Sequence, residues 1–586
     1  MPSKTRRKKN TRKISGPDDW DSWSFHLTSR VTPINPLRLI PAKKKSPLRW
    51  ATTKDTGGAA QQLIKKVNRW VRGKEPQVSD LAESLEEWLA AAEGRPVCAG
   101  FGLEALAWTY ILPRLASSLP AAPWCQVFDY LSELPRRIDG AETSDKPLEQ
   151  QLIGGELPLV LSYLFPEVNS CCELGKIAQE RLSSGVNELL DGNGLPTAGH
   201  LALLRPLLAC WTRCGYLARA AGVSCFDEKA RLQYEWLVRR ALQLTRQDGT
   251  QVFSVCTDEP EKGIDELLDA ALMLIGDQED NAIADQVLPG RKALRKKSQS
   301  GVYFPDASTH SKWGEIAILR PNWLRGGEHL VVTYKDRAVR TELNCGSSTI
   351  WSGPWSARIT VDGKPLDLQS DWHQNCWYSD DDVDYLELEA KLDNGWRLER
   401  QMLLAREDHF LLVADVLLGS AEADIEYRNV FPLTDGIRFE AAEETHDGYL
   451  VANRRLALVM PLALPEWRVA KTDGTLEATA DGLELRQKAR AARLYAPLFI
   501  DLDRKRLKKP LTWRQLTVGQ ELQAQPPSAA VGYRVQVGAG QWLFYRSLTP
   551  PANRTVLGQN LYNEFYAGRF DTDGEVDELI AINSEE

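Results

Sequence analysis

The sequence lacks several patterns that mark common classes of protein. It has no stretch of about 18 apolar residues, so no transmembrane helix is predicted. A Gly-x-x-x-x-Gly-Lys-Ser/Thr loop, a Gly-x-Ser-x-Gly elbow and a His-Glu-x-x-His pair are also missing. These absences argue against a P-loop nucleotide-binding protein, an α/β-hydrolase and a zinc protease of the His-Glu type.

The ten cysteines form no Cys-x-x-Cys pair. Cys210 and Cys214 are four residues apart, which is the spacing of one helix face, but no neighbouring cysteine or histidine completes a set of zinc ligands. We therefore predict that most cysteines are small buried hydrophobic residues in a reducing compartment. No metal or cofactor is expected.

The first 15 residues hold seven basic side chains and no acidic one. Without them the formal net charge of −8 becomes −15, so the rest of the chain is a poor surface for nucleic acid. The basic segment is either a solvated arm or an arm that binds an anionic polymer or membrane lipid. No apolar stretch follows it, so we expect a cytoplasmic protein, or a periplasmic or cell-envelope protein if the start site is misassigned.

A chain of 586 residues is too long for one ordinary core and predicts two or more domains. Residues 1–55 combine the basic arm with a proline-rich linker, in which several aromatic residues can pin the segment to the body. From 56 to 296, apolar residues recur at helical spacing. The expected helices are 79–92, 101–118, 122–136, 147–165, 172–190, 198–219, 227–246 and 264–275.

Two similar breaks, Asp191-Gly192-Asn193-Gly194 and Asp248-Gly249-Thr250, lie 57 residues apart, which indicates repeated helix pairs stacked as a solenoid or a toroid. Beyond residue 297 the apolar period changes from about 3.6 to 2. Asn394-Gly395 stands between two alternating segments and is a strong hairpin signal. Residues 297–586 are therefore predicted to form a large antiparallel β-sandwich.

Helices followed by a sandwich, at this length, resemble the heparinase II/III-like polysaccharide lyases. Residues 154–167 resemble an inner toroid helix of that family, and 189–204 resemble its Asp-Gly turn and active-site helix. Residues 314–324 resemble its first sandwich strand, and 372–417 resemble a later aromatic-rich hairpin. The resemblance covers roughly residues 100–420. It implies an incomplete α/α toroid over 56–296, followed by an antiparallel β-sandwich.

The resemblance also implies a lyase that cleaves uronate-containing glycans by β-elimination. Such a site needs a group that neutralises the uronate carboxylate, a base that removes the C5 proton and an acid that protonates the leaving oxygen. The family's toroid Asn or His position falls near Glu156, which is predicted to contact the substrate. The Tyr or His position on the next helix falls at or beside His200, which is predicted to be catalytic because an imidazole titrates near neutral pH.

The family's sandwich histidine has no counterpart in the segment after Trp323, where Tyr334 is the nearest residue able to act as base or acid. Tyr334 is therefore the second predicted catalytic residue. Arg337 and Arg340 are predicted to bind a carboxylate or sulfate, since guanidinium groups do so bidentately. Trp323 is predicted to line the substrate groove. For each of these residues an ordinary structural role is the alternative.

A non-catalytic relative is a second hypothesis, because the family's catalytic set is only partly matched. Such a protein would bind glycans or serve as a scaffold for an acidic polymer or another protein. The partner expected first is an acidic polysaccharide or oligosaccharide. Binding without product formation would distinguish the second hypothesis from the first.

Overall fold

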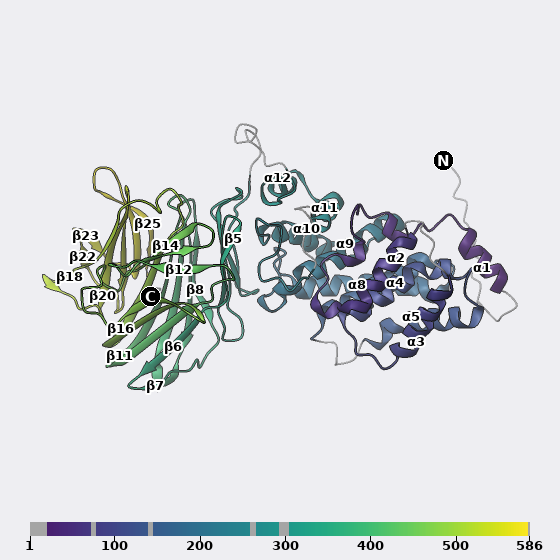
Figure 1. Ribbon diagram of the computed structural model, residues 1–586, viewed down its shortest axis with the longest axis horizontal. Helices are drawn as coiled ribbons and strands as arrows, with labels where there is room; N and C mark the ends of the chain where they lie inside the picture. Colours follow the sequence, from purple (N-terminus) through teal and green to yellow (C-terminus); the bar gives the residue numbers. More distant parts are fainter. Residues whose placement is uncertain (1–19, 72–77, 139–144, 258–264, 292–303, 584–586) are drawn as a thin grey trace. The chain divides into compact units, whose positions relative to one another are not determined.

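The computed structural model describes residues 20–71, 78–138, 145–257, 265–291 and 304–583. The chain divides into two compact units, Met1–Tyr303 and Phe304–Glu586. Helices build the first unit and strands build the second (Figure 1). The predicted basic arm, residues 1–15, lies outside the described residues.

The helices of the first unit include a counterpart, within a few residues, for each predicted helix, and also helices at 20–29, 57–71 and 278–287 that were not predicted. They are α1 Trp20–Ser29, α2 Gly57–Val71, α3 Val78–Ala92, α4 Ala99–Leu115, α5 Ala121–Arg137, α6 Pro147–Glu149, α7 Leu157–Leu164, α8 Asn169–Leu189, α9 Leu204–Ala221, α10 Glu228–Gln243, α11 Glu266–Ile275 and α12 Gln278–Val287. The predicted helix 147–165 consists of α6, a π-helical segment Gln150–Glu156 and α7.

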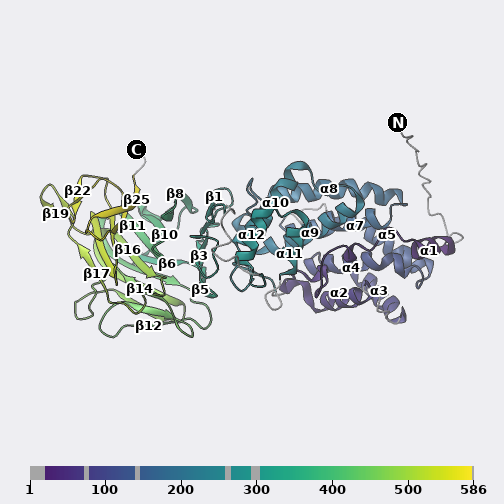
Figure 2. The same cartoon turned by 90° about the horizontal axis from the view of Figure 1, so that it is seen from above.

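Helix α4 is buried along almost its whole length, and it packs against α2, α5 and α7 (Figure 2). Its sequence is apolar on all sides, which is the pattern of a helix at the centre of a helical domain. The π-helical segment also lies inside, because Gly155 lets it approach α8 closely. A Cβ atom on Gly155 would come within 2.5 Å of the Leu182 side chain.

Residues 20–55, predicted as a proline-rich segment that aromatic residues pin to the body, fold against the helices of the first unit. Trp20 packs on Trp124 with ring centroids 5.4 Å apart, and Trp50 is buried. The prolines of this segment start short 3₁₀ turns, Pro36–Arg38 and Pro47–Arg49, that bury Leu37 and Leu48. Apolar residues spaced between prolines thus provide contacts with the core without long regular elements.

The second unit is built from antiparallel sheets. The first sheet runs β1 Thr309–Ser311, β2 Ile316–Leu319, β3 Glu328–Thr333, β4 Arg340–Cys345 and β5 Ser348–Pro354. The large sheet holds β6 Ser356–Val361, β7 Lys364–Pro365, β8 His373–Ser379, β9 Val383–Lys391, β10 Arg397–Ala405, β11 Phe410–Phe431, β12 Arg438–Ala441, β13 Gly448–Val451, β14 Arg455–Pro461, β15 Thr475–Thr479 and β16 Gly482–Asp501.

Two further sheets complete the second unit. One contains β17 Leu511–Leu516, β20 Ala530–Val537, β21 Gly540–Ser547, β24 Phe565–Phe570 and β25 Val576–Ile582. The other contains β18 Gly519–Gln520, β19 Gln523–Ala524, β22 Arg554–Val556 and β23 Gln559–Leu561.

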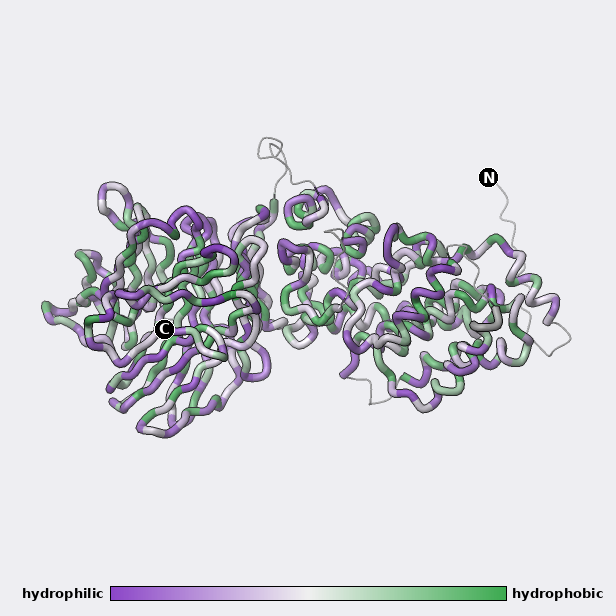
Figure 3. The backbone as a smooth tube through the Cα atoms, in the orientation of Figure 1, coloured by the Kyte–Doolittle hydropathy of each residue, from purple (hydrophilic) through white to green (hydrophobic). Residues whose placement is uncertain are grey.

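The large sheet is buried on both faces. Leu386 and Leu388 of β9 belong to a core shared with the first sheet, whereas Tyr385 belongs to a core shared with the β17–β25 sheet. A sheet covered on both faces explains why residues 402–418 are almost continuously apolar, and β10 and β11 are the two buried strands predicted there. Figure 3 shows hydrophobic and hydrophilic residues interspersed along both units.

The predicted hairpin at Asn394-Gly395 is confirmed. Strands β9 and β10 pair antiparallel, and Lys391 lies opposite Arg397. Asn394 and Gly395 have φ angles of 57° and 76°, the left-handed conformation that this residue pair favours. Among the described residues, no helix is both long and apolar enough to cross a membrane.

Candidate functional site

The two Asp-Gly turns of the first unit have the same construction. The Asp191 carboxylate accepts hydrogen bonds from the backbone N–H groups of Asn193 and Leu195, and Asp248 accepts one from the N–H of Thr250. His200 follows the first turn, in a 3₁₀ segment Ala198–Leu203 that leads into α9. It is half-buried, and its Nδ1 lies 2.9 Å from the Thr197 hydroxyl. This contact orients the ring of the predicted catalytic histidine.

Glu156 forms a buried ion pair with Arg213. Its two oxygens accept hydrogen bonds from Arg213 Nε at 2.6 Å and Nη2 at 2.7 Å, and the Glu156 side chain is 0% exposed. Arg213 Nη1 also donates to the Pro47 carbonyl. The pair therefore connects the π-helical segment, α9 and the proline-rich segment. This is a structural arrangement, and it directs both Glu156 oxygens toward Arg213 instead of toward solvent.

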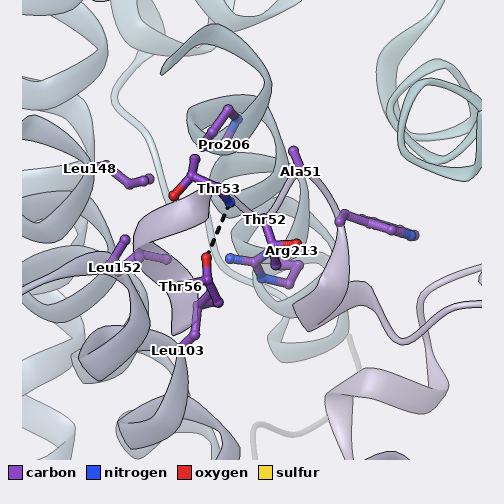
Figure 4. A pocket seen from close by; sticks show the side chains of 11 residues that line it. Ala51, Thr52, Thr53, Thr56, Leu103, Leu148, Leu152, Pro206 and Arg213 are labelled. Atoms are coloured by element: carbon purple, nitrogen blue, oxygen red, sulfur yellow. Dashed lines mark hydrogen bonds between the residues drawn. The ribbon is translucent and has the colours of Figure 1, made fainter. Parts of the chain in front are cut away.

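A small cavity lies beside this ion pair (Figure 4). Its lining includes Thr53, Thr56 and Arg213, and the Thr53 N–H donates to the Thr56 hydroxyl. Its volume of about 20 Å³ holds a water molecule but not a sugar ring. The cavity is therefore not a substrate site.

In the second unit, Tyr334 lies just beyond β3 and is only 2% exposed. Its hydroxyl lies 2.9 Å from Nε2 of His310, which belongs to β1. The His310 ring stacks on Trp377 of β8, with centroids 5.2 Å apart. Three strands thus bring a tyrosine, a histidine and a tryptophan together at one edge of the sandwich.

The surroundings set the protonation of this pair. Burial, with a smaller contribution from the nearby Lys312 ammonium group, lowers the pKa of His310 to about 4. Burial, with a smaller contribution from the Glu315 carboxylate, raises the pKa of Tyr334 above its ordinary value. At neutral pH both rings are therefore uncharged, so the contact between them is a hydrogen bond of neutral groups.

The backbone around Tyr334 is strained. Glu315, whose carbonyl accepts the Tyr334 N–H, has a φ angle of 54°, and Asp336 and Arg337 have φ angles of 52° and 60°. Such left-handed angles are unfavourable for residues with a Cβ atom and gather at functional sites. The cluster therefore favours a functional role for the His310–Tyr334 edge.

The remaining predicted residues have different surroundings. Arg337 is 57% exposed, and its guanidinium lies 3.5 Å from Asp371 and donates to the Leu368 carbonyl. Arg340 is exposed at the start of β4. Trp323 is buried, and its indole N–H donates to the Pro305 carbonyl at 2.7 Å. Arg337 and Arg340 are therefore the residues of this group that solvent reaches.

Among the described residues, two groups bring three ligand-type side chains within 4.8 Å of one another: the buried Glu156, Cys210 and Cys214, and the buried Glu387 and Glu399 with the half-buried Glu564. In each group an arginine already pairs with the carboxylates. Arg213 holds Glu156, and Arg546 contacts all three glutamates of the second group. Because a guanidinium occupies the position that a cation would take, we interpret both as structural charge networks.

The glutamates of the second group differ in protonation. Burial raises the pKa of Glu399 to about 7, more than the attraction of Arg546 lowers it. Burial acts on Glu387 as well, but Arg546 and hydrogen bonds from Tyr385, Gln401 and Asn375 outweigh it and lower the pKa of that carboxyl. As pH falls, Glu399 therefore takes up a proton before Glu387 does, and burial raises the pKa of Glu564 as well.

No family model matches the chain, and no curated protein sequence is similar to it. Solved structures are similar. The heparan sulfate lyase HepC from Pedobacter heparinus has a TM-score of 0.55 at 11% identity, and the match covers 90% of this chain and 94% of that one. A heparinase III has a TM-score of 0.57 at 9% identity, with 93% and 94% covered. Another heparinase III has a TM-score of 0.55 at 12% identity, with 93% of each chain covered.

The chain has the fold of these lyases. The predicted fold class, a helical toroid-type domain followed by a large antiparallel β-sandwich, is confirmed. The structural match establishes the fold. At identities of 9–12% it does not establish the activity, which has to be argued from the residues of this chain.

Proposed function

We propose that this protein is a carbon–oxygen lyase that cleaves uronate-containing polysaccharides by β-elimination. The observation that carries the proposal is the hydrogen bond between His310 and Tyr334, two side chains able to take up and return protons. The fold adds support, because solved structures that share it are named as heparan sulfate lyase and heparinase.

In the proposed reaction, the His310–Tyr334 pair takes the C5 proton of the uronate. The bond between C4 and the glycosidic oxygen breaks, a double bond forms between C4 and C5, and the pair returns a proton to the leaving oxygen. A neutral imidazole is the form that accepts a proton, and His310 is neutral at pH 7. A bound uronate carboxylate would raise the pKa of His310, because a nearby negative charge favours the imidazolium.

Arg337 and Arg340 are proposed to bind the substrate's carboxylate or sulfate groups. Both are exposed; Arg337 lies in the turn that follows Tyr334, and Arg340 begins the next strand, β4. His200 is proposed as a separate catalytic residue of the first unit, oriented by Thr197. Uronate polymers are therefore the substrate class, and no cofactor is proposed.

The direct test is the absorbance of unsaturated uronate, followed with a panel of polyuronates and glycosaminoglycans. We expect product from at least one polymer with the full chain, and a loss of about 100-fold or more in kcat for His310→Ala. Tyr334→Phe keeps the ring but removes the hydroxyl, so the fall in kcat of this variant measures the contribution of the hydrogen bond. His200→Ala tests the other predicted catalytic residue independently.

Tyr562→Phe serves as a matched control, since Tyr562 is an exposed tyrosine in the loop after β23. It should leave the rate unchanged. Full activity of both His310→Ala and Tyr334→Phe would remove this pair from the mechanism.

A glycan-binding protein without lyase activity is the second candidate. The observation that favours it is the burial of Glu156 and Tyr334, two predicted site residues that the structure turns away from solvent. Calorimetry with the same panel distinguishes the candidates. Saturable binding with no absorbance change would favour the glycan-binding protein.

A further inference from the structure

A four-residue turn, residues 312–315, joins β1 to β2 beside the His310–Tyr334 pair. A charged residue at each end of this turn shifts the pKa of one member of the pair. The Lys312 charge acts on His310, and the Glu315 charge acts on Tyr334. Ser311 holds the turn closed, because its hydroxyl accepts a hydrogen bond from the Gly314 N–H.

Trp313 stands at the middle of this turn with 54% of its surface exposed. An indole offers a large, rigid apolar face with a polar N–H at its edge, which suits the face of a sugar ring. Within the part of the chain that the structure describes, Trp313 stacks on no other ring. The indole is therefore presented to solvent on the turn that follows His310.

Lys312 supplies an available positive charge at the same place. Among the described residues its ammonium group forms no ion pair, whereas the neighbouring Arg337 faces Asp371 and Lys335 lies close to Glu315. An unpaired ammonium group on the residue before an exposed indole is complementary to a sugar ring that carries an anionic group.

We propose that Trp313 and Lys312 form a binding subsite for an acidic sugar ring, with the indole against the ring and the ammonium group at its carboxylate or sulfate. This inference rests on the proposed function, because it places the ring beside the pair that would take its proton. It adds the residues that select an acidic pyranose. Trp377 and Tyr334 support the site by fixing His310 and do not take part in this contact.

The test measures glycan binding and catalysis separately. Binding is measured by calorimetry in the His310→Ala background, where the glycan stays intact, with the same polyuronates and glycosaminoglycans. Trp313→Ala should weaken binding about tenfold or more, and Trp313→Phe should retain most of the affinity. Lys312→Ala should weaken the binding of acidic glycans but not that of neutral ones. Lys312→Arg should restore the binding of acidic glycans.

Trp467→Ala is the matched control, because Trp467 is 45% exposed in the same unit, in a loop beyond β14. It should bind like the parent. Unchanged affinity in Trp313→Ala, equal losses in both tryptophan variants, or no binding of any acidic glycan by the parent would each overturn the subsite.

The two proposals fail in different ways. If Trp313→Ala loses binding while the native chain forms no unsaturated product, the subsite holds and the lyase proposal fails. If product forms and Trp313→Ala leaves KM unchanged in an otherwise native chain, the lyase proposal holds and the subsite fails.

Discussion

At the scale of single residues, burial is the main cause of the shifted pKa values of His310 and Glu399. An exposed histidine takes up a proton near pH 6.5, whereas burial between β1, β3 and β8 lowers the pKa of His310 to about 4. Glu399 shows the opposite shift, because burial disfavours the charged form of a carboxyl. Each shift leads to a measurable dependence on pH.

The lowered pKa of His310 predicts a pH profile. If neutral His310 is the form that accepts the proton, kcat/KM at pH 5.5 should stay within about twofold of its value at pH 7.5. A base with an ordinary histidine pKa of about 6.5 would lose roughly tenfold over that range. Initial rates with a good substrate at the two pH values measure the difference, and a tenfold fall would contradict the assignment.

The raised pKa of Glu399 predicts that the network weakens the fold at high pH. Between pH 4.5 and 7 the folded chain holds a proton on Glu399 that the unfolded chain has released, so this contribution to stability falls as pH rises through 7. Glu399→Gln imitates the protonated carboxyl. Urea denaturation measures the free energy of unfolding of the variant and of the native chain at each pH. The variant's value minus the native value should therefore rise between pH 5.5 and pH 8 by on the order of 1–3 kcal/mol. A constant difference would show that Glu399 does not carry the proton.

At the scale of elements, glycine decides how closely the first Asp-Gly turn approaches α10. Gly194 has a φ angle of 77°, and a Cβ atom on it would lie 2.5 Å from the Leu237 nitrogen. Gly192, two residues earlier, is exposed and has no atom within 4 Å of such a Cβ position. The same turn therefore offers a sensitive glycine and an insensitive one.

We expect Gly194→Ala to lower the free energy of unfolding by about 1–3 kcal/mol, because the substitution is strained and crowded. Gly192→Ala should change it by less than about 0.5 kcal/mol. Chemical denaturation followed by circular dichroism measures both. Equal effects of the two substitutions would contradict this description of the turn.

The helices and the large sandwich could be predicted from the sequence because they follow from periodicity, a local property. Helices α1, α2 and α12 are exceptions that were not predicted, and neither were the short turns within residues 36–56, since turns between prolines carry no period. The π-helical segment was also missed, because its apolar residues fit an ordinary helix.

The candidate site was predicted only in part for a related reason. Tyr334 was found through the family resemblance, but its partner His310 lies 24 residues earlier, on a strand of three residues that is too short to show alternation. Contacts across a sheet depend on register, which residue spacing alone does not reveal.

At the scale of the whole molecule, the net charge of the chain is negative, whereas the residues proposed to bind the substrate's anionic groups are positively charged. The chain carries −8 overall, so an acidic polymer is repelled at a distance and must be held by local cations such as Lys312, Arg337 and Arg340. The fold alone does not decide between cleavage and binding, because solved structures at 9–12% identity share only the architecture. The nature of the product does decide.

The most direct measurement is mass spectrometry of products formed by the native chain from a polyuronate that it binds. Elimination adds no water, so we predict fragments whose new non-reducing end is an unsaturated uronate and whose mass is one water lower than that of the corresponding hydrolysis product. Saturated fragments that contain the added water would indicate hydrolysis. Those fragments, or an intact polymer despite binding, would contradict the assignment of this protein as a lyase.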